Sequence, residues 1–409
     1  FGPSLALMVE PRLFAVESNS NQRRNMKAPT ITAAPSKSVA YALLITLFVC
    51  CVVPVSMAGK PSGKGGGQGG GDDGGGDPVD TPPVTYSIQW LTPPAGMSYR
   101  ILDINDNGWT SGQMITDEVP FAAVAFTPDG TPIDLNALAP LPSEDGYYMR
   151  GGHRISDNGV VVGQAYNPLT DQYRNYRYIP AGLRDTIPVS EILPDTGSRN
   201  PTVNRFGDVA CQIPDTETVR VYFLDSTIEP WVPEVQGVRA ISGFNDQFQL
   251  LYLGPWAGDG NAVLYKYTPS AEQESFYLHT VARMNNYGTI VAKAWSTNLR
   301  SSNHVSYSDE GEASVILEKA DGYPTGINDA GEIIGWAGQR NISNYVYFPS
   351  NGLWDVNNLV ADSGGTKWQS AEIALEAINN NGQIAGTADV VSDNGEIVSE
   401  GFILTPVAP

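Results

Sequence analysis

Short apolar runs alternate with polar turn residues from about residue 84 onward, and one order of residues returns seven times. Each copy has an apolar residue, Asn, a polar pair, Gly and an apolar run ending at a small residue: INDNGWTSG from Ile104, ISDNGVVVG from Ile155, VNRFGDVAC from Val203, FNDQFQLLY from Phe244, MNNYGTIVA from Met284, INDAGEIIG from Ile327 and INNNGQIAG from Ile378. The copies start 40 to 51 residues apart, a period typical of propeller blades.

The residues inside each copy are those of a tight hairpin turn. The second is Asn in all copies but one, which has Ser156, and such side chains hydrogen-bond backbone groups further along a turn. The fifth is usually Gly, where a left-handed backbone costs another residue roughly 1 to 2 kcal/mol. A mostly small ninth residue suits close blade packing, with Cys211 as a small core filler. The fourth copy has Phe248 and Tyr252 instead, so it is degenerate or specialised.

Two further strands follow each copy. A third strand ends at an aromatic residue, as at Phe126, Tyr178 and Phe348, and a fourth follows in PIDLNAL from Pro132, SFYLHT from Ser275, SVILEK from Ser314 and LWDVNNL from Leu353. The seventh unit lacks a fourth strand, whereas YSIQWL from Tyr86 stands unassigned before the first. We therefore predict an all-β fold: a seven-bladed β-propeller of four-stranded antiparallel blades over residues 84–409, with the ring closed by the N-terminal strand.

The residues before this repeat divide into three segments. We expect translation to start at Met26, with residues 1–25 an over-extended gene assignment. Residues 26–58 have positive, apolar and small residues in the order of a signal peptide, with an uncleaved membrane anchor as the alternative. Residues 59–83 are rich in Gly and Pro and predict a flexible linker. No membrane insertion is expected after cleavage of the signal.

Charge and residue usage exclude several classes of partner. The chain has 44 Asp and Glu against 24 Lys and Arg, so it would repel nucleic acids and anionic lipids. Only Cys211 lies beyond the signal segment, which excludes an internal disulfide and a cysteine metal cluster. The three histidines show no zinc-ligand spacing. We expect no metal, no cofactor and a monomer.

The repeats resemble the bacterial extracellular family named for its His-Ala-Phe (HAF) signature. Residues 327–335, INDAGEIIG, match its first segment closely, and Ala125-Phe126 match its second segment without the histidine. The resemblance implies secretion and a propeller-like repeat fold. It implies no reaction and transfers no catalytic residue.

Acidic residues at the third position of the copies suggest a ring of calcium ligands, at Asp106, Asp157, Asp246 and Asp329. A hairpin turn favours Asp and Asn there for local reasons, which is the interpretation we prefer. The stretch from Asp103 to Gly108 imitates a calcium loop, but Met114 occupies the position that needs a bidentate carboxylate.

Longer and more variable loops are expected between strands two and three and between successive blades. These are Asp117 to Phe121, Pro140 to Arg150, Tyr166 to Asn175 and Ala361 to Glu376. Both kinds of loop lie on one face of a propeller, so this face is the predicted binding face. Five aromatic residues of these loops are candidates for stacking on a sugar or anchoring a protein: Tyr147, Tyr148, Tyr166, Tyr173 and Trp368. Alternatively, they fold back to cover the blade edges.

These observations favour a secreted or surface-tethered propeller that binds a glycan or an extracellular protein without catalysis. The first alternative is a propeller glycosidase or lyase with its site in the central channel, because paired carboxylates suffice for glycoside hydrolysis. The second is a structural component of the cell envelope. Converging carboxylates or arginines in the channel would favour an enzyme.

Overall fold

The structure is a computed structural model of the 409-residue chain. It describes residues 82–116, 121–142, 146–194, 201–213, 216–256, 262–269, 274–277, 282–296, 301–309, 312–339, 342–360, 367–368, 371–391 and 395–407. The expected N-terminal extension, signal peptide and nearly all of the linker lie outside these residues. Within the described part, no helix has both the length and the apolar character needed to cross a membrane.

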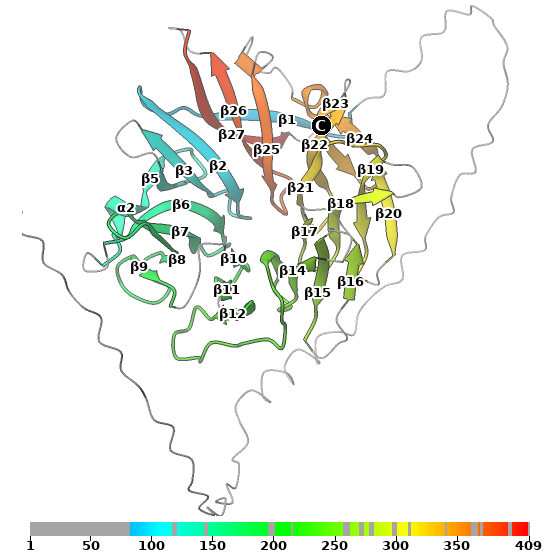
Figure 1. Ribbon diagram of the computed structural model, residues 1–409. Helices are drawn as coiled ribbons and strands as arrows, with labels where there is room; N and C mark the ends of the chain where they lie inside the picture. The colour runs from blue at the N-terminus through cyan, green and yellow to red at the C-terminus, as the bar shows by residue number, and fades with distance from the viewer. Residues whose placement is uncertain are drawn as a thin grey trace, which may run out of the picture. The chain divides into compact units, whose positions relative to one another are not determined.

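The described residues form a seven-bladed β-propeller, as the repeat predicts (Figure 1). Blades 1 to 3 consist of β2 Met97–Ile104, β3 Thr110–Thr116, β4 Ala122–Phe126 and β5 Pro132–Asp134; β6 Tyr148–Ile155, β7 Val161–Asn167, β8 Gln172–Ile179 and β9 Val189–Ile192; and β10 Thr202–Val203, β11 Val209–Ile213 and β12 Thr218–Tyr222. All paired strands within each sheet are antiparallel.

The remaining blades repeat this meander. Blades 4 to 6 consist of β13 Ala240–Phe244, β14 Leu250–Trp256, β15 Ala262–Tyr267 and β16 Glu274–Tyr277; β17 Ala282–Met284, β18 Ile290–Ser296, β19 Ser301–Tyr307 and β20 Ala313–Leu317; and β21 Tyr323–Ile327, β22 Ile333–Gln339, β23 Ile342–Phe348 and β24 Gly352–Asp355. Blade 7 consists of β25 Glu372–Ile378, β26 Ile384–Val391, β27 Ile397–Val407 and β1 Thr85–Leu91.

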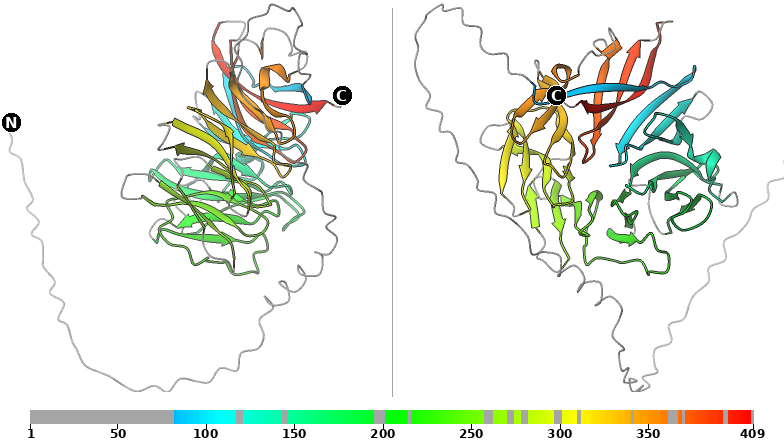
Figure 2. Two further views of the ribbon diagram at one scale, coloured as in Figure 1. Left: turned by 90° about the vertical axis from the view of Figure 1, so that its right-hand side faces the viewer. Right: turned by 180° about the vertical axis from the view of Figure 1, so that it is seen from behind.

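The predicted closure of the ring is confirmed. Strand β1 pairs with β27 along its whole length, from Thr85 opposite Val407 to Leu91 opposite Gly401. Figure 2 shows the sheets from the side and from behind, with β1 beside β27. Tyr86 is buried within β1, and its backbone N–H also donates to the carbonyl of Leu359 at 2.8 Å. The last blade therefore depends on residues from both ends of the repeat.

The predicted turn geometry is also confirmed. The fifth residue of each copy has a positive φ, for example 78° at Gly108 and 83° at Gly159. Phe248 adopts the same conformation in the fourth copy, with φ of 59°. Its ring packs against Phe244 and Trp231 at centroid distances of 5.7 and 6.2 Å. These aromatic contacts offset the cost of a left-handed backbone at a residue with a side chain.

The fourth strands are shorter than the sequence pattern suggests. In blade 1, the predicted strand PIDLNAL gives way to helix α2 Leu135–Leu138, because the Asp134 side chain caps the backbone N–H groups of Asn136 and Ala137. In blade 6, LWDVNNL similarly enters the 3₁₀ helix η2 Val356–Asn358 after Asp355. Leu135, Val356 and Leu359 still pack inward, whereas Leu138 is exposed.

Blade 3 departs further, since the described residues give it a three-stranded sheet. An isolated bridge between Val221 and Trp231 takes the place of the fourth strand. Trp231 also packs against Phe248 of blade 4. The unusual Phe248 therefore helps to cover the edge of its three-stranded neighbour, so the fourth copy is specialised.

The small ninth residue of most copies is explained by a close contact within the blade. A Cβ atom at Gly163 would lie 1.7 Å from the carbonyl oxygen of Gly151, and one at Gly112 would lie 2.1 Å from that of Arg100. Both obstructing carbonyls belong to the first strand of the same blade, where a β-bulge breaks the register. The small residue accommodates this bulge.

Candidate functional site

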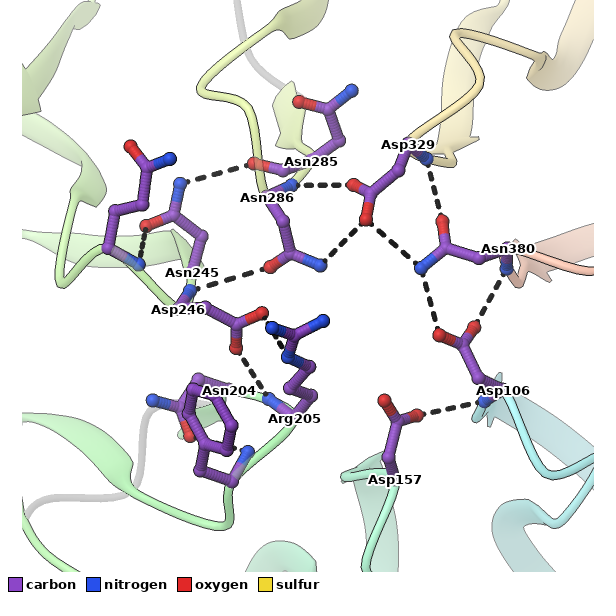
Figure 3. Close-up of polar contacts among 12 residues, drawn as sticks. Asp106, Asp157, Asn204, Arg205, Asn245, Asp246, Asn285, Asn286, Asp329 and Asn380 are labelled. Atoms are coloured by element: carbon purple, nitrogen blue, oxygen red, sulfur yellow. Dashed lines mark hydrogen bonds and ion pairs between the residues drawn. The ribbon is translucent and has the colours of Figure 1, made fainter. Parts of the chain in front are cut away.

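The seven hairpin turns meet at one end of the central channel. Their second and third residues form what we call the turn ring: Asn105-Asp106, Ser156-Asp157, Asn204-Arg205, Asn245-Asp246, Asn285-Asn286, Asn328-Asp329 and Asn379-Asn380 (Figure 3). They line a cavity of about 170 Å³. The first strands of the blades bring these residues together, because each strand ends at its turn.

The asparagine of each turn has two roles. The Oδ1 atom of Asn105 accepts from the backbone N–H groups of Asn107 and Trp109 at 3.1 and 2.9 Å, which closes its own turn. Its Nδ2 donates to the carbonyl of Ser156 in the next blade at 2.8 Å. The same link to the next blade recurs at four other asparagines: Asn245, Asn285, Asn328 and Asn379. An Asp or Ser would lack this amide donor.

The third residues also link the blades, which corrects the prediction that they serve their own turns alone. The Asp157 carboxylate accepts from the backbone N–H of Asp106 at 2.9 Å, and that of Asp329 accepts from Asn286 at 2.8 Å (Figure 3). The Asp106 carboxylate accepts from Asn380 at 2.8 Å and completes the circuit between the last blade and the first. Turn residues in neighbouring blades are thus hydrogen-bonded around the axis.

Amide and guanidinium groups lie between the carboxylates of the turn ring. Asn380 Nδ2 donates to both Asp106 and Asp329, at 2.9 and 3.1 Å, and Arg205 Nε contacts Asp246 at 2.7 Å. Burial nevertheless raises the pKa of Asp246 to about 6, although Arg205 opposes the shift. Burial also raises the pKa of Asp157. Because these groups hydrogen-bond mainly to one another, the turn ring serves a structural role in holding the blades together.

The turn ring does not resemble a metal site. Across the described ranges, no group of three or more His, Cys, Asp or Glu side chains is placed to hold a metal ion.

Next to the turn ring along the central channel lies a charged cavity, which we call the channel mouth. It encloses about 300 Å³ and is lined mainly by residues of the first strands, including Arg100 of β2, His153 and Arg154 of β6, Arg283 of β17 and Glu376 of β25. Blades 1, 2, 5 and 7 therefore each contribute a titratable side chain to one space. Because every first strand ends at its turn, the channel mouth lies on the side of the turn ring that faces the predicted binding face.

The charges of the channel mouth influence one another. Burial lowers the pKa of Arg283 to about 10, and the positive charge of Arg154 adds to this effect. Burial raises the pKa of Glu376, while Arg100, Arg283 and Arg154 oppose the shift. Arg100 and Glu376 form a long ion pair of 3.8 Å. Deeper in, burial raises the pKa of Asp103, whose carboxylate accepts from the backbone N–H of Ile155 at 2.9 Å.

Three guanidinium groups in one opening are distinctive in a chain of formal net charge −20. Each guanidinium presents several fixed donors suited to carboxylate, sulfate and other oxygen-rich groups. With Glu376 as an acceptor, the channel mouth can hydrogen-bond a polar ligand from several sides. Converging charges of this kind are the feature expected from the sequence to favour an enzyme over a binding module.

Three of the predicted site tyrosines come together, but on strands. Tyr148 begins β6, Tyr166 lies in β7 and Tyr173 lies in β8. The long loop expected from Tyr166 to Asn175 is wrong, since β7 and β8 pair directly and leave only residues 168–171 between them. The alternation of side chains along these polar strands places the rings on one side of the hairpin.

These tyrosines surround the guanidinium of Arg150. Tyr166 and Tyr173 have ring centroids 4.8 Å apart, and Arg150 donates to the Tyr173 hydroxyl at 2.6 Å. Arg150 also lies 4.5 Å from the centre of the Phe121 ring. Tyr147, just before β6, hydrogen-bonds Gln172 at 3.2 Å. The cluster is half-buried, so it presents ring edges on the binding face while its centre is filled by Arg150.

Trp368, the fifth predicted residue, is only 2% exposed. Its ring packs against Trp90 and Phe402 at centroid distances of 6.3 and 5.3 Å, on the two paired strands β1 and β27. Trp368 therefore follows the alternative interpretation, in which the aromatic residue folds back to cover a blade edge.

Sequence reasoning missed the residues of the channel mouth. Arg154 and Arg283 both stand immediately before the first apolar residue of their copies, at the end of the innermost strand. The signal that could have found them is a charged residue at this position, directly before the turn, where the side chain lines the channel. Arg100 and Glu376, at the most exposed part of the site, do not stand at this position of the repeat, so no such signal marks them.

No protein-family model matches this chain, and no curated protein matches it. Among solved structures, the chain is similar to a streptogramin B lyase, with 12% identity and a TM-score of 0.46 over 79% of this chain and 98% of that one. It is also similar to virginiamycin B lyase from Staphylococcus aureus, with 13% identity and a TM-score of 0.44 over 79% and 100%. An acylaminoacyl peptidase from Pyrococcus horikoshii is 15% identical, with a TM-score of 0.43 over 61% of this chain and 44% of that one. These identities are too low to carry an activity to this chain.

Proposed function

We propose that the chain is a secreted or surface-tethered binding module that takes a glycan or an extracellular protein without catalysis, as a member of the HAF-type repeat proteins that it resembles. The ligand contacts the face on which the channel mouth opens. The observation that carries the proposal of a ligand site is the convergence of Arg100, Arg154, Arg283 and Glu376 in one cavity, and the same convergence supports the enzyme considered below. The groups of the turn ring are occupied by one another.

A screen of immobilised glycans and secreted proteins against the full chain tests this proposal, with an Arg283→Met variant as the probe of the site. Arg283 is half-buried, and replacing a poorly solvated charge by an apolar side chain of similar size tends to preserve stability. We expect the variant to melt near the parent temperature and to bind its ligand about tenfold more weakly.

The matched control is Arg205→Met, which removes a guanidinium from the turn ring. Its affinity should equal that of the parent. Equal losses in the two variants, or no bound glycan or protein in the screen, would contradict a binding role for the channel mouth.

A channel-site glycosidase or lyase is the second candidate, because charged groups rather than apolar plugs line the channel mouth. Glu376, held 3.8 Å from Arg100, is the carboxylate best placed to act on a bound sugar. The test is to incubate the full chain with each glycan that it binds and to measure new reducing ends and unsaturated products. Products that disappear in Glu376→Gln, with binding retained, would establish an enzyme; an unchanged glycan supports the binding module.

A further inference from the structure

A second polar cavity adjoins the channel mouth, between blades 6, 7 and 1. It encloses about 440 Å³, within the range of about 300 to 1,000 Å³ usual for small-molecule sites, and we call it the interblade groove. Its lining combines two aromatic rings with oxygen-bearing side chains: Tyr323, Thr325, Trp336, Asn344, Glu376 and Asp389. Arg100 and Glu376 line both cavities, so the groove and the channel mouth are continuous at that pair.

The aromatic rings of the groove are unusually exposed. Trp336 has 43% of its surface accessible and Tyr323 has 41%. The two residues are direct partners in the pairing of β21 with β22, and their rings meet edge to face at 6.1 Å. The backbone beneath them is fixed, because Asp321 and Gly322 both donate to the carbonyl of Ala337 at 3.1 Å. The backbone that carries the two rings is therefore fixed, and each ring leaves part of its surface exposed.

Two buried oxygen atoms of the groove lack a hydrogen-bond partner within the described part of the chain. Asn344 is 5% exposed and donates its Nδ2 to the carbonyl of Ile373 in blade 7 at 2.9 Å, but its Oδ1 is unpartnered. Thr325 is 9% exposed, and its Oγ1 is also unpartnered. A buried polar atom without a partner costs free energy, so a ligand that supplies a donor would be favoured here.

The charge of the groove selects among ligands. Glu372, Glu376 and Asp389 supply carboxylates, whereas Arg100 supplies a guanidinium. Within a chain of formal net charge −20, this balance disfavours an anionic ligand and favours one that donates hydrogen bonds. A neutral pyranose has hydroxyl donors around its edge and C–H groups on its faces, which suit carboxylate acceptors and an exposed aromatic ring respectively.

From these observations we infer that the interblade groove is a subsite for a neutral hexose or pentose unit of an oligosaccharide, with Trp336 as the stacking surface and Thr325 and Asn344 as partners of its hydroxyl groups. This inference rests on the proposed binding function and names its ligand class. The opening shared at Arg100 and Glu376 lets a longer chain continue toward the channel mouth.

Calorimetric titration of the full chain with pentasaccharides tests the inference. The probes are maltopentaose, cellopentaose, mannopentaose and xylopentaose, with pentagalacturonate as the anionic comparison. We expect one neutral series to bind and pentagalacturonate to bind more weakly. Trp336→Ala should weaken binding about tenfold or more, as loss of an aromatic anchor does. The control is Tyr287→Ala, which removes a 62% exposed aromatic ring beside the turn ring and should leave affinity unchanged.

Thr325→Val separates a ligand contact from a structural role. The substitution keeps the shape and removes only an unpartnered hydroxyl, so the melting temperature should hold or rise while affinity falls several-fold. Unchanged affinity in Trp336→Ala and Thr325→Val, equal losses in Tyr287→Ala, or tighter binding of pentagalacturonate would overturn the inference. If the chain binds a protein ligand that needs Arg283 but not Trp336, the saccharide subsite is overturned and the proposed function stands. If the chain binds neither a glycan nor a protein, both the subsite and the proposed function are overturned.

Discussion

The side-chain amide of Asn379 in blade 7 donates a 2.8 Å hydrogen bond to the backbone carbonyl of Asn105 in blade 1, which lies 274 residues earlier in the chain. The ring is thus closed twice, near the axis by this turn contact and at the periphery by the pairing of β1 with β27. Both closures join residues from the two ends of the repeat.

Asn379→Asp should destabilise the propeller by about 1 to 3 kcal/mol. An Asp keeps the acceptor for the backbone N–H groups of Asn381 and Gln383, but it loses the donor to Asn105. Chemical denaturation measures the effect. Asn351→Asp, at an exposed turn between β23 and β24, is the control and should change stability by less than about 0.5 kcal/mol. Equal effects at the two positions would show that the hydrogen bond from Asn379 to Asn105 contributes nothing specific to stability.

Ser156→Asn should stabilise the propeller by about 0.5 to 1.5 kcal/mol. Ser156 Oγ accepts from the backbone N–H of Val160 but has no amide to donate toward the next blade, unlike Asn105. An Asn would keep the local acceptor and supply a donor for the carbonyl of Asn204. A lower denaturation midpoint in the variant would mean that the junction between blades 2 and 3 cannot accommodate the longer side chain.

Asp246→Asn should change the dependence of stability on pH. The pKa of Asp246 is raised to about 6 in the folded protein from an ordinary value of 3.8, so its stabilising contribution is present below about pH 4 and is lost as the pH rises through 6. The variant should therefore melt higher than the parent at pH 8, and the difference should shrink as the pH falls toward 4. At neutral pH we expect a gain on the order of 1 kcal/mol.

Asp225→Asn should change the pH dependence of stability in the opposite direction. Hydrogen bonds from Thr227 lower the pKa of this exposed carboxyl, so its contribution is present at neutral pH and is lost on acidification. Relative to the parent, the melting curves of the two variants should therefore change in opposite directions, between pH 4 and 8 for Asp246→Asn and below about pH 4 for Asp225→Asn. Parallel curves for the two variants would contradict the role of burial at Asp246.

Gly163→Ala should destabilise blade 2 by about 3 kcal/mol or more, because the added methyl would overlap the carbonyl of Gly151 at 1.7 Å. Gly243→Ala is the matched control in blade 4, where the nearest atoms to a new Cβ lie at 3.4 Å. Thermal melts should show a large loss for the first and a small change for the second. Similar losses would mean that the bulge in the first strand adjusts freely.

Phe248→Gly should destabilise the protein despite relieving a left-handed backbone. The relief is worth roughly 1 to 2 kcal/mol, whereas loss of a packed aromatic ring costs about 3 to 5 kcal/mol when it is fully buried. Phe248 is half-buried, so the loss of its ring costs about half of that value and we expect a net loss of up to about 1 kcal/mol. The fluorescence of the chain should also shift, because Trp231 packs against this ring. A rise in stability would show that the aromatic contacts contribute little.

The repeat made the fold predictable because its signals are local. An Asn and a Gly three residues apart specify a turn wherever they occur, and the unpaired segment at Tyr86 identified the strand that closes the ring. The failures concern contacts between blades. The carboxylate of Asp106 binds a backbone 274 residues away, which no spacing within one repeat indicates.

The candidate site was less predictable for a related reason. Tyr166 and Tyr173 were expected in a loop because their neighbours are polar, but pairing of β7 with β8 satisfies that backbone. Trp368 was expected on the surface, and the joint between β1 and β27 buries it. Arg283 and Trp336 drew no attention because each is ordinary in its own repeat; only the closing of the ring brings them beside other charged and aromatic residues.

The pairing of β1 with β27 also imposes an order on how the propeller is made. Strand β1 is synthesised before every other strand, and its partner is synthesised after all of them. Tyr86 and the hydrogen-bonding groups of β1 therefore remain without their partner strand until the last blade leaves the ribosome. A nascent chain that stalls before Ile397 would carry this unsatisfied strand, which a chaperone or protease can recognise as a mark of incomplete synthesis.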